Sequence, residues 1–370
     1  MEVGAGLHLT YCTNIHPANG WAAVQDRLRE HAPALRARLA PESPFGIGLR
    51  LSGSESAELL QGDRLARFRD WLDSEALYVF TINGFPHGAF HGQPVKADVH
   101  APDWRSEERV AYTLRLAEIL AALLPEGQTG TISTNPLSYR PWIEGDADAW
   151  ERCTANVARV GQELRRMRSE RGVQIALALE PEADGALATC ADLARWWDER
   201  LDRDHVTACF DACHAAVAFE EPAEAFATLA AAGIRIGKVQ LSAALRLRPA
   251  VRQELARFAD PIYLHQVTQR NADGSYCSWP DLPEALSAAR VHGEEWRVHF
   301  HVPIFLAGYG ALQSTQDYLR ETITLVRDRG VSSHLEIETY TWDVLPSGLK
   351  VDLLESIARE YDWVLAAMAR

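Results

Sequence analysis

Short β-rich runs alternate with longer amphipathic helical patterns along the whole chain of 370 residues. The helical patterns include Trp21–Leu39, Glu55–Ser74, Ser106–Leu124, Ala147–Arg171 and Gln316–Arg329. Eight runs have strand character, namely His8–Thr13, Gly46–Leu51, Tyr78–Gly84, Thr131–Asn135, Gln174–Glu180, Val206–Asp211, Ile234–Leu241 and His334–Tyr340. Alternation of this kind predicts β-α units that build a parallel sheet.

Eight strands with intervening helices favour an α/β fold of the closed (β/α)8 TIM-barrel type over an open, doubly wound sheet. The first strand is not followed by a G-x-G-x-x-G turn, which weakens a dinucleotide-binding interpretation. Such a barrel takes about 250 residues and can exceed 400 with insertions. We therefore expect residues 1–370 to form a single domain.

Two places interrupt the alternation. Phe85–Arg105, after the third strand, is a long loop rich in glycine, proline and histidine, and loops of this length are usually functional or disordered. After the seventh strand we expect a hairpin insertion, because Tyr263–Thr268 and Ser275–Ser278 flank the Asp-Gly turn signal of Asn271–Gly274. The alternating segment Val298–Pro303 beyond it would be an added strand or an extension over the barrel mouth.

Charge and composition argue against several kinds of partner. The net charge of −14 argues against duplex nucleic acid, because neutralising phosphates requires a basic surface. No stretch approaches the roughly 20 apolar residues of a membrane span, and the start of the chain lacks the pattern of a secretion signal. The six cysteines are scattered, as is typical of reduced thiols. We expect a cytoplasmic protein without membrane insertion.

The fifth strand carries the first candidate site residue. A period of two places Ala176, Ala178 and Glu180 on one face, which we assign to the barrel lumen. Glu180 then lies at the C-terminal rim, where catalytic residues of this fold gather. The alternative is an exposed loop carboxylate, and Glu182, past a proline, is expected to be in a second layer around the site or exposed to solvent.

The sixth strand ends at Asp211, and His214 follows three residues later. A carboxylate and an imidazole at one strand end suit Mn²⁺, Zn²⁺, Fe²⁺ or Co²⁺. An isolated Asp-x-x-His is a weak signal, because both residues are common where a strand turns into a helix. Its place at a strand end, about thirty residues after Glu180, strengthens the prediction of a divalent metal site.

The last strand places Glu336 and Glu338 on one face. Two carboxylates directed into a barrel are costly unless a metal or hydrogen-bonding partners receive them. We predict that Glu338, nearer the rim, is a metal ligand, and that Glu336 pairs with Lys238. The alternative is an edge strand that exposes both glutamates to water.

Further polar residues lie near predicted strand ends. Gln240, at the rim of the seventh strand, can offer a carbonyl oxygen to a metal or hydrogen-bond a substrate. His265, His299 and His301 lie in and after the insertion, and we predict that His301 is an additional metal ligand, although a single histidine is more often structural. Besides Gln240 and His265, we expect substrate contacts from Asn83, His87, Asn135, Tyr139 and Trp342.

The order of a rim Glu, an Asp-x-x-His, a polar rim residue on the next strand and a final rim Glu resembles the xylose isomerase-like TIM barrel superfamily. The resemblance implies a Glu, Asp, His, Glu ligand set, which maps onto Glu180, Asp211, the seventh-strand position and Glu338. This chain has Gln240 where the superfamily most often has His, so His214 or His301 would supply the imidazole.

A narrower resemblance rests on segments that span nearly the whole chain: Leu9–Pro17, Asn83–Gly88, Phe90–Gly92, Pro102–Trp104 and Glu338–Asp343. They resemble the EboE metabolite-traffic family. That resemblance implies a bacterial cytosolic barrel encoded beside a prenyltransferase, a sugar-phosphate-cyclase-like enzyme and a metal hydrolase. The cluster is linked to moving a metabolite to the periplasm, and its other proteins are candidate partners.

Three functions compete at this stage, and oligomeric state stays open. The leading hypothesis is a metal-dependent isomerase or epimerase of a sugar-like or cyclitol-like polyol, in which Glu180 and Glu338 exchange a proton on opposite faces of the substrate. The second is metal-assisted hydrolysis of a small phosphorylated metabolite, with extra histidines holding further ions. The third is a non-catalytic metabolite carrier or assembly partner, supported by the Gln240 departure.

Overall fold

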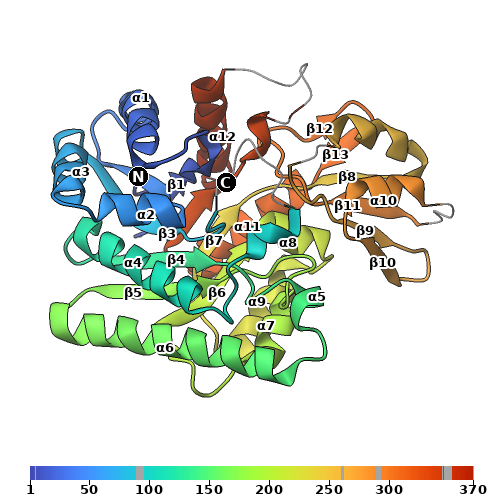
Figure 1. Cartoon of the computed structure of the whole chain (residues 1–370). Helices are drawn as coiled ribbons and strands as arrows, with labels where there is room; N and C mark the ends of the chain where they lie inside the picture. Colours follow the sequence, from blue (N-terminus) through green and yellow to red (C-terminus); the bar gives the residue numbers. More distant parts are fainter. Residues whose placement is uncertain are drawn as a thin grey trace.

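The computed structural model describes residues 1–4, 6–88, 96–259, 262–288, 293–343, 345 and 352–369. Eight parallel strands surround a common axis and helices cover the outside (Figure 1). The strands are β1 (His8–Tyr11), β2 (Phe45–Arg50), β3 (Leu77–Asn83), β4 (Thr129–Thr134), β5 (Gln174–Leu179), β6 (Val206–Asp211), β7 (Ile236–Leu241) and β14 (His334–Ile337). Their order in the sheet is β1-β14-β7-β6-β5-β4-β3-β2.

The two ends of this sheet meet. β1 pairs with β14 in parallel, and a parallel bridge joins Cys12, the residue after β1, to Gly48 of β2. Every strand predicted from the sequence is present, although most end one or two residues earlier than expected. The predicted (β/α)8 barrel is therefore confirmed.

Amphipathic helices fill the connections between strands. The longer ones are α1 (Trp21–Leu39), α2 (Gly53–Leu59), α3 (Arg64–Ser74), α4 (Glu107–Leu123), α6 (Ala147–Arg171), α7 (Cys190–Trp196), α8 (Ala212–Val217), α9 (Pro222–Ala231), α11 (Gln316–Arg329) and α12 (Leu353–Met368). The prediction of one helix over Glu55–Ser74 is wrong, because Gly62 has a φ of 60° and interrupts the right-handed helix between α2 and α3. Ser52 starts α2 with a capping box that includes Glu55.

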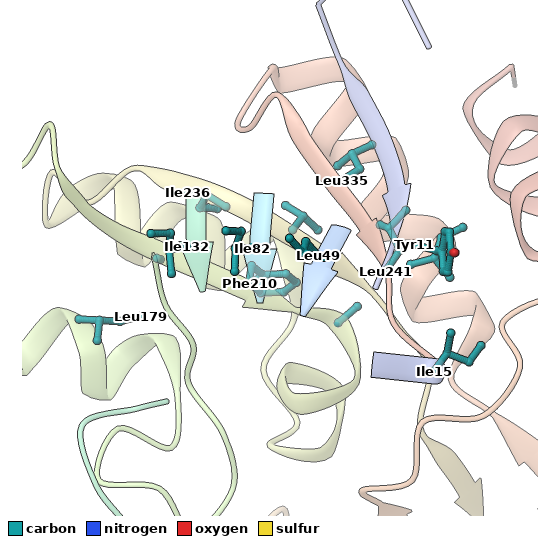
Figure 2. Close-up of a cluster of buried hydrophobic side chains, with 14 of the residues drawn as sticks. Tyr11, Ile15, Leu49, Ile82, Ile132, Leu179, Phe210, Ile236, Leu241 and Leu335 are labelled. Atoms are coloured by element: carbon teal, nitrogen blue, oxygen red, sulfur yellow. The ribbon is translucent and has the colours of Figure 1, made fainter. Parts of the chain in front are cut away.

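Apolar side chains between the strands and the helices form one continuous core. Ile82, Ile132, Phe210 and Leu335 belong to it (Figure 2). The lumen, by contrast, is partly polar: the fully buried Lys238 Nζ lies 2.5 Å from Glu336 Oε2, the ion pair expected from the sequence. Within the described part of the chain, no helix has both the length and the apolar content to cross a bilayer.

The insertion after β7 is larger than the predicted hairpin. It builds a six-stranded sheet in the order β10-β9-β11-β8-β13-β12 beside the barrel (Figure 1). Its strands are β8 (Leu245–Leu247), β9 (Val267–Arg270), β10 (Tyr276–Trp279), β11 (Glu295–Val298), β12 (Gly308–Tyr309) and β13 (Leu312–Ser314). The Asn271–Gly274 turn is present, but both hairpin strands lie later than predicted. β9 starts at Val267, since Tyr263–Gln266 is not in a strand, and β10 starts and ends one residue later than the predicted Ser275–Ser278. His299–Pro303 likewise follows β11 without continuing it.

The remaining short elements lie at loop ends. They are the 3-10 helices η1 (Thr13–Ile15), η2 (Lys96–His100), η3 (Pro249–Phe258) and η4 (Thr341–Asp343), with helices α5 (Arg140–Ile143) and α10 (Leu282–Ser287). Of the loop after β3, residues 89–95 lie outside the described residues, and with them the Phe90–Gly92 motif. The described part of that loop, η2 included, runs toward the second sheet, where the Lys96 backbone N–H donates to Ile262.

Candidate metal centre

Three carboxylates converge at the C-terminal ends of the barrel strands. Glu180 directly follows β5, Asp211 is the last residue of β6, and Glu338 directly follows β14. All three side chains are buried, and one oxygen from each lies within 4.8 Å of the others. The alternating face predicted for these strands thus does bring Glu180, Asp211 and Glu338 together.

Hydrogen bonds orient two of these carboxylates, those of Glu338 and Asp211. Glu338 Oε1 accepts hydrogen bonds from Asn14 Nδ2 at 2.9 Å and Asn83 Nδ2 at 3.0 Å. Asp211 Oδ1 accepts from Ser242 Oγ at 2.8 Å and from a backbone N–H. Within the described part of the chain, the buried Glu180 Oε2 and Asp211 Oδ2 have no hydrogen-bond partner. Leaving charged oxygens in that state is costly, and a bound cation would compensate them.

The Nε2 atom of His301 lies next to the Nε2 atoms of two other histidines, His214 and His299. His301 Nδ1 lies 2.9 Å from the Glu338 carbonyl and His214 Nδ1 lies 3.1 Å from the Pro181 carbonyl. A carbonyl can only accept, so both Nδ1 atoms carry a proton, and in the neutral form of each ring the Nε2 atom holds the lone pair. His299 follows the same scheme, with Nδ1 2.7 Å from Gln266 Oε1.

The spacing of these Nε2 atoms matches that of ligands around one ion. His301 Nε2 lies 3.3 Å from Nε2 of His214 and 3.3 Å from Nε2 of His299. Two nitrogens bound about 2.05 Å from a tetrahedral ion are about 3.3 Å apart. Lone pairs that face each other at this distance repel unless a cation or a proton lies between them, so the residues fit a divalent metal.

The donor atoms form overlapping groups instead of one isolated set. Asp211, His214 and His301 have ligand atoms mutually within 4.8 Å, which joins the carboxylate and imidazole groups. Two further groups within the same distance add Glu182 to His214 and His299, and Cys213 to His299 and His301. The centre therefore has donors for one ion between the carboxylates and for a neighbouring ion among the imidazoles.

Burial and mutual repulsion alter the acidities in this centre. Burial raises the pKa of Glu180 to about 7 and that of Glu182 to about 8. Burial, and then the nearby Glu180 and Asp211, raise the pKa of Glu338 well above its usual range. For His214, burial would lower the pKa, but surrounding carboxylates more than offset it and the pKa is raised. Several carboxyl groups that resist losing their protons are thus crowded at the place where a bound cation would favour their charged form.

Above the donors lies a pocket with an empty volume of about 560 Å³ that opens to solvent. Asn83, predicted to contact substrate, lines it, together with Glu180, Glu338 and His214. Gln240 is buried below the rim, opposite Asp211 and Glu336 in the strand register, and is not among the described lining residues.

Other predicted substrate residues lie farther from this pocket. His265 donates from Nδ1 to the His299 carbonyl at 2.9 Å and so supports the histidine cluster from behind.

The His87 ring packs edge-on against Tyr112, with centroids 4.7 Å apart. Tyr139 stacks on His100, and Trp342 is buried. Asn135 donates to the His100 carbonyl, and none of these side chains is among the described lining residues.

Sequence reasoning gave too little weight to two donors. His299 was one of several histidines without an assigned role, and Glu182 was expected in a second layer or in solvent, yet both line the pocket and both are buried. The alternation His299-x-His301 is the signal that could have identified His299, since it directs both rings to one side of an extended segment. No comparable local pattern marks Glu182, which Pro181 separates from its strand.

Comparisons with known proteins agree with this architecture. The family model described as xylose isomerase-like TIM barrel matches residues 46–290. A magnesium complex of a xylose isomerase-like TIM barrel protein from Mycobacterium smegmatis is similar to the chain, with 16% identity, a TM-score of 0.57, and 100% of this chain and 98% of that chain covered. No curated protein matches the sequence.

Two further solved structures are similar over almost the full length. A D-tagatose 3-epimerase-like protein has 11% identity and a TM-score of 0.53, covering 98% of this chain and 97% of its own. The IOLI protein with a zinc atom has 13% identity and a TM-score of 0.51, with 98% of each chain covered. At these identities the likeness supports the fold.

Proposed function

This chain belongs to the xylose isomerase-like TIM barrel family, and from that premise we propose that it is a metal-dependent isomerase or epimerase of a small sugar-like or cyclitol-like metabolite. One observation carries the proposal: Glu180 and Glu338 are buried together with Asp211, and one carboxylate oxygen from each lies within 4.8 Å of the others. Similar folds in a D-tagatose 3-epimerase-like protein and an L-ribulose 3-epimerase support the class of reaction.

The side chains of this centre suit proton transfer at a carbon beside a carbonyl group. A divalent ion, when bound, supplies the Lewis acidity that makes such a carbon acidic. Glu180 would remove the proton and Glu338 would return one from the other side. The two glutamates would exchange these roles when the other epimer is the substrate. Asn14 and Asn83 hold Glu338 in place through its Oε1, which fixes the direction of its other oxygen.

The test combines elemental analysis with proton exchange. The purified protein, loaded with Mn²⁺ or Co²⁺, is incubated with ketoses and cyclitol ketones in D₂O, and deuterium incorporation is followed by NMR. We expect exchange in the wild type and a loss of about 100-fold or more in Glu180→Gln and Glu338→Gln. Glu42→Gln, at an exposed position, is the matched control.

The outcomes separate the alternatives. Metal retained without exchange on any polyol would contradict the isomerase proposal and favour hydrolysis or a carrier. Absence of metal in the reconstituted wild type would contradict the metal centre itself. Retention of full metal content in Glu180→Ala and Glu338→Ala, which remove the ligand oxygens, would show that the ion binds elsewhere.

A second candidate function is metal-dependent hydrolysis of a small phosphoester. The observation that favours it is the imidazole group beside the carboxylates, in which His301 Nε2 lies 3.3 Å from Nε2 of His214 and of His299. Two neighbouring ions can stabilise the attacking and leaving oxygens of a displacement. Two metal ions per chain in the elemental analysis, with release of phosphate from a phosphorylated polyol, would favour this function.

The cellular setting is also a proposal. The resemblance of the N-terminal, loop and C-terminal motifs to the EboE family supports a role in the biosynthesis or traffic of a metabolite in the bacterial cytoplasm. Other proteins of that pathway would then supply the substrate or receive the product. To test this setting, the chain would be purified from a strain that encodes the cluster. We expect the other proteins encoded in the cluster to co-purify with it.

A further inference from the structure

The pocket above the metal centre has two chemically different halves. Its floor consists of donor side chains such as Glu180, Glu338 and His214. Its mouth includes the apolar or aromatic side chains of Phe85, Pro86, Val99, Tyr263, Leu264 and Tyr340. A site for a free sugar would need hydrogen-bonding groups around the whole ligand, because every hydroxyl that loses water must be compensated.

The apolar mouth is not part of the barrel core. Tyr263 forms a small separate cluster with Val99, Ile262 and Tyr340. The rings of Tyr263 and Tyr340 meet edge to face, with centroids 5.4 Å apart. These residues come from η2, from the segment before β9 and from the segment after β14, so three distant parts of the chain contribute to one apolar wall.

The cation that the described residues place at the mouth is already paired. Lys96 is the one lysine or arginine among the described lining residues. Its Nζ donates to Asp281 Oδ2 at 2.6 Å and to the Tyr263 carbonyl at 2.7 Å. Since this cation is engaged, the mouth is poorly suited to a phosphate or carboxylate on the outer end of the substrate.

We propose that the mouth binds an apolar substituent, so that the substrate is a polyol carrying an aryl or alkyl group instead of a free or phosphorylated sugar. This inference rests on the proposed function, because the polyol end is placed at the metal centre. The substituent would lie against Val99, Leu264 and the ring of Tyr263, and water leaving these surfaces would contribute to binding.

The test uses two chelating probes that differ only in the apolar group, acetohydroxamate and 3-phenylpropanohydroxamate. Their affinities for the Co²⁺-loaded full chain are measured by calorimetry. We expect the phenyl probe to bind about tenfold tighter or more, which is about 1.4 kcal/mol. In Val99→Asn and, as a second variant, Leu264→Asn, this ratio should fall below about threefold.

Val331→Asn is the matched control, because Val331 lines a separate cavity at the opposite end of the barrel. This variant should keep the wild-type ratio. Equal affinities of both probes for the wild type would overturn the apolar subsite while leaving the metal centre in place. If neither probe binds the loaded protein, the metal centre is wrong and the subsite falls with it. An unchanged ratio in both mouth variants would also overturn the assignment.

Discussion

At the scale of single residues, Glu360 joins the two segments that carry the candidate metal ligands Glu338 and His301. Its buried Oε1 accepts hydrogen bonds from Thr339 Oγ1 at 2.7 Å and from the Ile304 N–H at 3.2 Å. Thr339 adjoins Glu338, and Ile304 lies three residues after His301. Burial raises the pKa of Glu360 to about 8, so this carboxyl group is largely protonated at neutral pH.

The raised pKa of Glu360 makes a prediction for stability. The folded chain keeps this proton up to about pH 8, whereas the unfolded chain releases it near the ordinary value of 4.5. The contribution of Glu360 is therefore fully present below pH 4.5 and is lost as pH rises toward 8. Glu360→Gln keeps an acceptor oxygen without titrating, so relative to wild type it should gain roughly 2–5 kcal/mol between pH 5 and pH 8.

Urea unfolding of the metal-free proteins at pH 5 and pH 8 measures this gain. Exposed Glu42→Gln should follow the wild type at both pH values. A Glu360→Gln protein that loses stability in parallel with the wild type would show that Glu360 does not titrate in this range.

At the scale of elements, β2 approaches its neighbours so closely that it requires glycine at position 48. A Cβ there would lie 1.8 Å from Glu336 Oε1 and 2.7 Å from the Tyr11 carbonyl. The obstacle includes backbone and a carboxylate held by Lys238, so it cannot move freely. We infer that Gly48 sets the distance at which β1 and β2 close the barrel.

Gly48→Ala should consequently destabilise the protein by about 3 kcal/mol, or prevent folding. Gly88→Ala is the control, because a Cβ at position 88 meets none of the described residues within 4 Å, and its effect should stay within about 0.5 kcal/mol. Thermal unfolding monitored by circular dichroism measures both. Equal melting temperatures for the two variants would contradict the role given to Gly48.

At the scale of the whole molecule, the second sheet shares the core of the barrel. Trp296 and Val298 of β11 and Leu245 of β8 are fully buried and belong to the same apolar cluster as the barrel strands. Because these side chains of the insertion share the core of the barrel, the two sheets should unfold together. The single domain over residues 1–370 is still a prediction, and this shared core supports it.

Coincident unfolding would confirm that single domain. Far-ultraviolet circular dichroism follows the helices around the barrel, and tryptophan fluorescence includes Trp279 and Trp296 of the second sheet. In urea, both signals should change in one transition with the same midpoint. Two midpoints separated by more than the experimental error would show that the insertion is a domain of its own.

The sequence alone determined the barrel and half of the candidate centre. Strand and helix periods are local properties, so alternation over eight units specified the fold, and a period of two at strand ends placed Glu180, Asp211 and Glu338 toward the lumen. Helix and strand ends were less certain, as the break at Gly62 shows, because a single glycine in a helical pattern is ambiguous.

Tertiary structure decided the rest. The ring orientations of His214 and His301 depend on carbonyls at Pro181 and Glu338, which lie 33 and 37 residues away in the chain. Likewise, Glu182 becomes a donor only because the second sheet brings His299 to it. The apolar mouth joins three distant segments. Such contacts are absent from local sequence patterns, since they form only when the chain has folded.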